Sequence, residues 1–110
     1  MSKSEINFTV HLDENKVPER IDWQATDSDG ESSCKATFIS LWDEREQNTF
    51  RIDLWTKEMQ VDEMKRFFHQ NIMTMADTFK SATNEHEMAE DMKAFGRYFG
   101  EKMLGIDPEG

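Results

Sequence analysis

Residues 49–75, TFRIDLWTKEMQVDEMKRFFHQNIMTM, decide the fold class, because the spacing of the apolar residues changes within this stretch. Up to residue 55, apolar and polar side chains alternate, which predicts a strand with Phe50, Ile52 and Leu54 on one face. After residue 60 the apolar residues recur every three or four positions, which predicts an amphipathic helix. One chain therefore contains strands followed by helices.

Toward the N-terminus, three more stretches alternate in the same way. They begin at Ile6, Ile21 and Cys34, so that the four expected strands fall between about residues 5 and 56. The connections are polar: residues 13–19, residues 26–33 with a turn at Asp29-Gly30, and residues 43–48. Connections this short favour antiparallel pairing, because a parallel pair needs a crossover of a dozen residues or more.

Two helices are expected after the strands, over about residues 61–82 and 85–104. Asp62 and Glu63 suit the positive end of the first helix dipole, and Asn84 is expected to cap the second helix. Gly105 and Pro108 end it. The apolar stripes consist of Met64, Phe68, Ile72, Met75, Phe79 and Ala82 in the first helix and Met88, Met92, Phe95, Phe99 and Met103 in the second. Gly96 and Gly100 indicate either the close approach of another helix or a weakened helix end.

The expected architecture is a single α+β domain over residues 1–110. A four-stranded antiparallel meander sheet is followed by two amphipathic helices packed on one face of the sheet. The residues expected to fill the core on the sheet side are Phe8, Val10, Ile21, Trp23, Phe38, Trp42, Phe50, Ile52 and Leu54.

Charge excludes one large class of partners. The chain has 13 basic and 23 acidic residues and a formal charge of -10, and acidic residues exceed basic ones in both halves. Binding of nucleic acid requires clustered Lys and Arg to neutralise phosphates, so no nucleic acid partner is expected. The sequence has no apolar stretch typical of a signal peptide or a membrane span, which predicts a cytoplasmic protein without membrane insertion. Cys34, the one cysteine, is expected to be a half-buried strand residue.

No pattern indicates catalysis or a cofactor. The acidic loops fail the calcium-loop test, since Ser32 and Phe38 stand where a glycine and a bidentate Glu are needed. His11, His69 and His86 show no metal-ligand spacing, and no Gly-rich phosphate loop or GxSxG elbow is present. We therefore expect no catalytic residue, no metal, no cofactor and no enzyme activity.

One face of the predicted sheet has the composition of an interaction surface. Exposed aromatic and aliphatic side chains beside an Arg are typical of protein interfaces. The expected surface consists of Ile39, Leu41, Arg51, Asp53 and Trp55. A second copy of the chain can use it to form a homodimer, and a different protein can use the same apolar centre. The alternatives are that these are scattered surface residues, or that residues 34–42 have the opposite register and turn Trp42 outward.

Several segments resemble one protein family. They are Leu12-Asp13-Glu14-Asn15, Val17-Pro18-Glu19, Ile21-Asp22-Trp23-Gln24-Ala25-Thr26, Ser40-Leu41-Trp42-Asp43, Arg51-Ile52-Asp53-Leu54-Trp55-Thr56-Lys57 and Val61-Asp62-Glu63-Met64. In these the chain is similar to the gliding motility-associated protein GldC family. The resemblance implies a small cytoplasmic accessory protein of gliding motility and its secretion apparatus, with no defined activity, cofactor or ligand.

The expected function is therefore that of a non-enzymatic adaptor of a gliding and secretion apparatus, acting through protein–protein contacts. The alternative is a small-ligand binding module with a pocket between the sheet and the helices.

Overall fold

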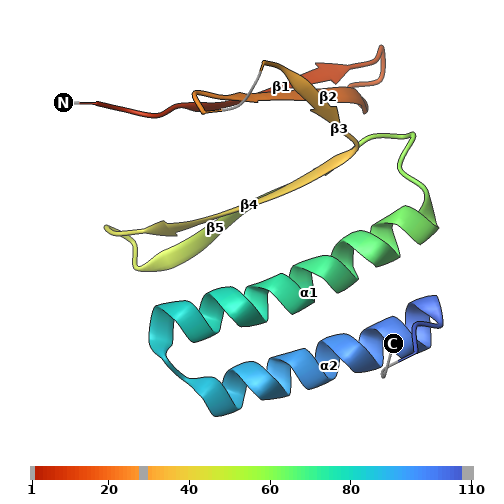
Figure 1. Cartoon of the computed structure of the whole chain (residues 1–110). Helices are drawn as coiled ribbons and strands as arrows, with labels where there is room; N and C mark the ends of the chain where they lie inside the picture. The colour runs from red at the N-terminus through yellow and green to blue at the C-terminus, as the bar shows by residue number, and fades with distance from the viewer. Residues whose placement is uncertain (1, 28–29, 108–110) are drawn as a thin grey trace. The chain divides into compact units, whose positions relative to one another are not determined.

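The computed structural model describes residues 2–27 and 30–107 and contains five strands and two helices in these ranges. The chain divides into two compact units, Met1–Met59 with the strands and Gln60–Gly110 with the helices (Figure 1). The α+β class with strands before helices is confirmed. The expected single domain and the packing of the helices on one sheet face stay predictions.

The first three strands form one antiparallel sheet in the order β1-β2-β3. They are β1 (Ile6–Leu12), β2 (Pro18–Ala25) and β3 (Ser32–Cys34). The register pairs Phe8 with Trp23 and Val10 with Ile21, so the apolar residues of β1 and β2 share one face. Ile21 on this face has no exposed surface. The expected Asp29-Gly30 turn includes a residue outside the described ranges.

The prediction of a single four-stranded meander is wrong. The segment expected to form the third strand forms two strands, and each of them belongs to a different sheet. Residues 32–34 pair with β2, whereas β4 (Ala36–Asp43) pairs with β5 (Asn48–Trp55) as a separate two-stranded ribbon. The change of partner falls at Lys35, whose carbonyl accepts a hydrogen bond of 2.8 Å from the Thr56 N–H. That bond ties the chain after β5 to the junction between the two sheets.

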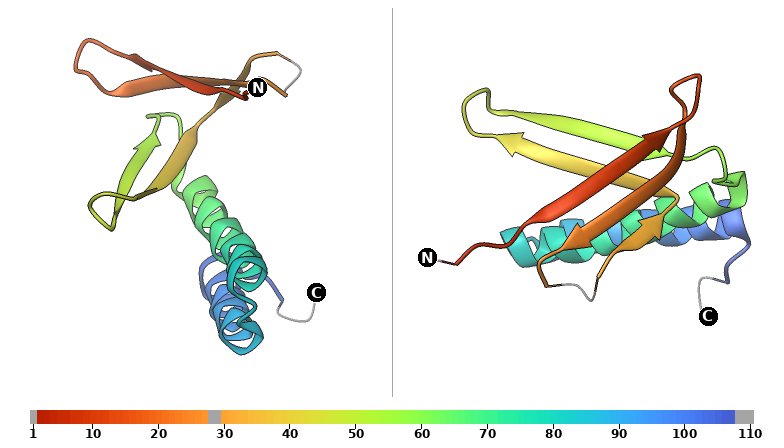
Figure 2. Two further views of the ribbon diagram at one scale, coloured as in Figure 1. Left: turned by 90° about the vertical axis from the view of Figure 1, so that its left-hand side faces the viewer. Right: turned by 90° about the horizontal axis from the view of Figure 1, so that it is seen from above.

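The two helices form an antiparallel hairpin, α1 (Val61–Thr83) and α2 (His86–Leu104), and lie side by side (Figures 1 and 2). Both elements occur where they are expected. Glu63 accepts a hydrogen bond of 3.0 Å from the Gln60 N–H at the start of α1. Gly105, with φ of 67°, ends α2 as expected, whereas Pro108 lies outside the described residues.

Asn84 has a different role from the one expected. It ends α1 in the left-handed conformation, with φ of 62°, and its N–H donates to the Lys80 carbonyl at 2.8 Å. The N-cap of α2 is Glu85, and no side chain of the described residues caps that helix. Asn tolerates the left-handed region better than other non-Gly residues, which suits it to a helix C-terminus followed at once by another helix.

At the contact between the helices, small residues of α2 lie against larger side chains of α1. The buried residues of the hairpin are Ala76, Ala89, Gly96 and Gly100. A Cβ at Gly100 would lie 2.8 Å from Nε2 of His69, and one at Gly96 would meet Sδ of Met73. The close approach expected of the two glycines is therefore confirmed. The large residues of the two stripes differ in burial. Phe68, Met75, Met88, Phe95 and Met103 are exposed, whereas Met64, Ile72, Phe79, Met92 and Phe99 are half-buried.

Gly100→Ala is expected to destabilise the hairpin by about 1–2 kcal/mol, although Ala normally stabilises a helix by about 1 kcal/mol relative to Gly. The reason is the overlap of the new methyl group with the His69 ring. Urea unfolding followed by helical circular dichroism measures the effect. In a His69→Ala background the same change should be neutral or stabilising, and an equal loss in both backgrounds would show that the ring does not cause it.

Candidate interaction surface

The β4–β5 ribbon carries all five residues of the predicted interaction surface. Its loop, residues 44–47, is held by Asp43, whose side chain accepts from the Glu46 N–H at 2.6 Å and whose carbonyl accepts from the Gln47 N–H at 2.9 Å. Gln47 adopts φ of 54°. The loop closes on the pair Asp43↔Asn48, and this pair fixes the register of every residue that follows.

The register divides the ribbon into two faces. Directly opposed residues share a face, and the pairs Phe38↔Asp53 and Ser40↔Arg51 therefore define one of them. We call this the Arg51 face; its residues are Phe38, Ser40, Trp42, Arg51, Asp53 and Trp55. We call the other the Ile52 face; its residues are Ile39, Leu41, Phe50, Ile52 and Leu54.

The expected surface is therefore split. Arg51, Asp53 and Trp55 share a face as expected, but Ile39 and Leu41 lie on the opposite one. The register of β4 is the one that turns Trp42 outward, and the exposed fraction of Trp42 is 66%. Phe38 and Trp42 thus lie on the face of Arg51 and not with Phe50, Ile52 and Leu54. The core expected on the sheet side is wrong for four of its residues, because Phe8, Trp42, Phe50 and Ile52 are exposed.

Arg51 is held by neighbours on its own face. Its guanidinium donates to Asp53 Oδ1 at 2.8 Å and to Ser40 Oγ at 2.9 Å. It also lies over the Phe38 ring, with Cζ 5.7 Å from the ring centroid, a cation–π distance. The hydrogen bond to Asp53 raises the pKa of Arg51. The side chain is fixed in place while its outer surface remains open.

Two tryptophans lie on the same face as this fixed Arg. Trp55, with an exposed fraction of 53%, lies two residues beyond Asp53 on β5, and Trp42 lies two residues beyond Ser40 on β4. Aromatic side chains and Arg are the residue types enriched at binding hot spots. The Arg51 face can therefore supply two aromatic anchors on the same face as one oriented positive charge.

A second polar site lies on the other sheet. Asp22 accepts from Ser33 Oγ at 2.8 Å and contacts His11 Nε2 at 2.9 Å and Arg20 Nε at 3.2 Å. The Ser33 hydrogen bond is the main cause that lowers the pKa of Asp22. Ser33 and His11 both bind the carboxylate, so this arrangement does not present a serine activated by a histidine.

Cys34 is half-buried in β3, as expected. Burial raises the pKa of its thiol, which lowers the fraction of reactive thiolate at neutral pH. Among residues 2–27 and 30–107, no three His, Cys, Asp or Glu side chains are grouped so that they could hold a metal ion.

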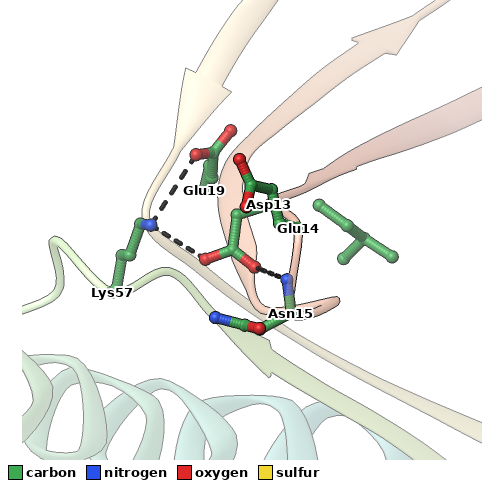
Figure 3. Close-up of a pocket in the computed structure, with 6 residues that line it drawn as sticks. Asp13, Glu14, Asn15, Glu19 and Lys57 are labelled. Carbon is green, nitrogen blue, oxygen red and sulfur yellow. Dashed lines mark hydrogen bonds and ion pairs between the residues drawn. The ribbon is translucent and has the colours of Figure 1, made fainter.

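A cavity of about 440 Å³ lies between the β1–β2 turn and the end of β5 (Figure 3). Asp13 organises it: one carboxylate oxygen accepts from the N–H groups of Asn15 and Val17 at 2.8 and 3.0 Å, and the other binds Lys57 Nζ at 2.9 Å. Lys57 Nζ also lies 3.7 Å from Glu19. Lys57 is thus shared between two carboxylates and links the turn to the ribbon.

The helical hairpin carries an open apolar groove of about 380 Å³. It is lined by Ile72 and Met75 of α1 and by Met88, Asp91, Met92 and Phe95 of α2. Met side chains adapt to ligands of different shape, and Asp91 adds a charge to the lining. No helix in the described part of the chain is long and apolar enough to cross a membrane.

Asp13 makes the fold sensitive to acid. The Lys57 hydrogen bond and the turn N–H groups lower the pKa of Asp13 from 3.8 to about 2. Because the folded pKa lies below the unfolded value, the carboxylate contributes its full stability above pH 3.8 and loses it as the pH falls through about 2.

Asp13→Asn should therefore lower the urea midpoint at pH 7, and the difference from the natural chain should shrink steadily as the pH falls toward 2. Glu14→Gln removes a charge from the same turn without touching Lys57 and is the matched control. A midpoint difference for Asp13→Asn that is independent of pH would contradict the role of the ionised Asp13.

In a comparison with known proteins, the chain matches one family model. The model of a family described as gliding motility-associated protein GldC-like matches residues 18–104. No curated protein and no solved structure matches the chain. The match includes the whole β4–β5 ribbon and both helices, and β1 and Asp13 lie outside it. Because it covers well over half of the sequence, the chain belongs to the gliding motility-associated GldC-like family.

Proposed function

We propose that the protein is a non-enzymatic cytoplasmic adaptor of a gliding motility apparatus and its associated secretion apparatus. The Arg51 face is the contact surface for a protein of that machinery. Family membership supports the process, since the matching family is gliding motility-associated. The single observation that carries the contact is the exposure of Trp42 and Trp55 on the same face as an Arg51 that is already held by Asp53, Ser40 and Phe38.

A held side chain favours tight binding. Fixing a flexible Arg on association costs conformational entropy, and this cost is smaller when intramolecular contacts have fixed the side chain beforehand. Trp and Phe rings add contact area with few rotatable bonds. The Arg51 face combines both properties, and it takes a partner that offers a carboxylate or a carbonyl oxygen between two apolar pockets.

The chemistry of the polar groups supports an adaptor rather than an enzyme. Asp22 engages both Ser33 and His11, and burial raises the pKa of the Cys34 thiol. Neither arrangement supplies an activated nucleophile. The cytoplasmic part of the proposal is supported by the lone half-buried Cys34, which suits a reducing compartment.

A small-ligand binding module is the second candidate, and the apolar groove of the hairpin is the observation that favours it. This groove lies within the helical unit. A thermal-shift screen of the whole chain against apolar metabolites discriminates the two proposals, since a ligand at 100 times its dissociation constant stabilises the folded state by about 2.7 kcal/mol.

Trp42→Ala and Trp55→Ala should each weaken capture of machinery proteins from cross-linked native cells by roughly thirtyfold, which corresponds to about 2 kcal/mol for an aromatic anchor. The urea midpoint should change little, because both side chains are already half or more exposed. Leu41→Ala, on the Ile52 face of the same ribbon, is the matched control and should capture as the natural chain does. Equal losses in all three variants, or none, would contradict the assignment to the Arg51 face.

A further inference from the structure

β5 is an edge strand of the two-stranded ribbon. β5 pairs with β4 along its whole length, from Ala36↔Trp55 to Asp43↔Asn48, and no other strand within residues 2–27 and 30–107 pairs with it. The register contains no bulge, and the strand contains no Pro. Bulges and Pro are common devices that prevent an edge from adding another strand. The backbone of β5 is therefore able to accept one.

The sequence of β5 is complementary to itself about Ile52. If two copies pair antiparallel with Ile52 opposite Ile52, Arg51 of each copy lies opposite Asp53 of the other. On the other face, Phe50 lies opposite Leu54. Every cross-strand pair is then either an opposite-charge pair or an apolar pair, apart from the ends of the strand.

Neighbouring registers lack this property. Centring the pair on Arg51 places Arg51 opposite Arg51, and centring it on Asp53 places Asp53 opposite Asp53, with like charges in contact. A register shifted by one residue places a charged side chain opposite an apolar one. The charges of Arg51 and Asp53 therefore favour the register centred on Ile52 and disfavour its neighbours.

The charges already present on the Arg51 face fit this arrangement. Within one strand Arg51 lies 2.8 Å from Asp53, so the pairing completes a square of four alternating charges with no net charge. The two chains each carry a formal charge of -10 and repel at long range, but salt at physiological concentration screens that repulsion beyond about 8 Å. The contact itself is neutral.

We propose that the protein forms a two-fold symmetric homodimer through the outer edge of β5, centred on Ile52. The product is a four-stranded antiparallel sheet in the order β4-β5-β5-β4, an isologous contact that uses the same residues of both copies. It places the two Arg51 faces side by side on one sheet. The proposal does not depend on the identity of any partner protein.

Charge variants of the full chain test it by sedimentation equilibrium. The natural chain should have twice the 13.0-kDa mass of the monomer. Arg51→Glu and Asp53→Arg should each weaken the dimer by at least about tenfold, because each places two like-charge pairs across the axis. An equimolar mixture of the two variants should recover the dimer, since the introduced acidic side chain of one variant then faces the introduced basic side chain of the other. A monomeric natural chain, or a mixture no better than its components, overturns the proposal.

Cross-linking tests the register independently of the charge variants. In a Cys34→Ser background, Ile52→Cys should form an intermolecular disulfide on mild oxidation, since opposed residues of antiparallel strands lie about 4.5–5.5 Å apart at Cα. Leu54→Cys on the same face is the matched control; its sulfur lies about 13 Å from its own counterpart, about four residues along the strand. Cross-linking of both variants to the same extent, or of neither, would overturn the Ile52-centred dimer.

Discussion

The pairing of β4 with β5 is the constraint on which the rest of the proposed interaction surface depends. A strand has a period of two, so a shift of one residue between β4 and β5 would exchange every partner on both faces. With the loop closed at Asp43↔Asn48, Arg51 meets Ser40 and Phe38 rather than Ile39 and Leu41. The same register leaves Trp42 and Trp55 on the Arg51 face. The closure of one short hairpin loop therefore determines which residues share the Arg51 face.

The two units bury their residues in different ways. In the strand unit Ile21 is fully buried, and Lys57 links the β1–β2 turn to the end of the ribbon through Asp13. In the helical unit the buried residues are small, and the glycines of α2 leave room for the Met73 and His69 side chains of α1. Large apolar side chains remain exposed on the ribbon and on the hairpin. A net charge of -10 is a physical reason why such a chain can stay soluble.

Much of the secondary structure was predictable because its signals are local. The change of spacing after residue 60 located α1 and α2 closely, and Gly105 ended α2 as expected. The division at Lys35 was not predictable from alternation, since apolar and polar residues continue through it while the pairing partner changes. Asn84 suits both a C-cap and an N-cap, and only the backbone conformation distinguishes the two.

The candidate surface was predictable in part. Alternation alone placed Arg51, Asp53 and Trp55 on one face of their strand, whereas the face that β4 adds to them depends on cross-strand register. The length of the polar loop could have predicted which residues of β4 share a face with Arg51. The polar run 43–48 places Trp42 opposite Thr49, and this pairing puts Trp42 and Phe38 with Arg51. The large apolar stripes predicted the helices correctly and their burial only in part, because the fully buried residues of the hairpin are Ala76, Ala89, Gly96 and Gly100.

Cross-strand nuclear Overhauser effects within β4–β5 test the register most directly. The structure predicts contacts between the backbone protons of Phe38 and Asp53 and of Ser40 and Arg51, with Arg51 side-chain protons near the Phe38 ring. Contacts that instead pair Ile39 with Asp53 and Leu41 with Arg51 would contradict the composition of the Arg51 face.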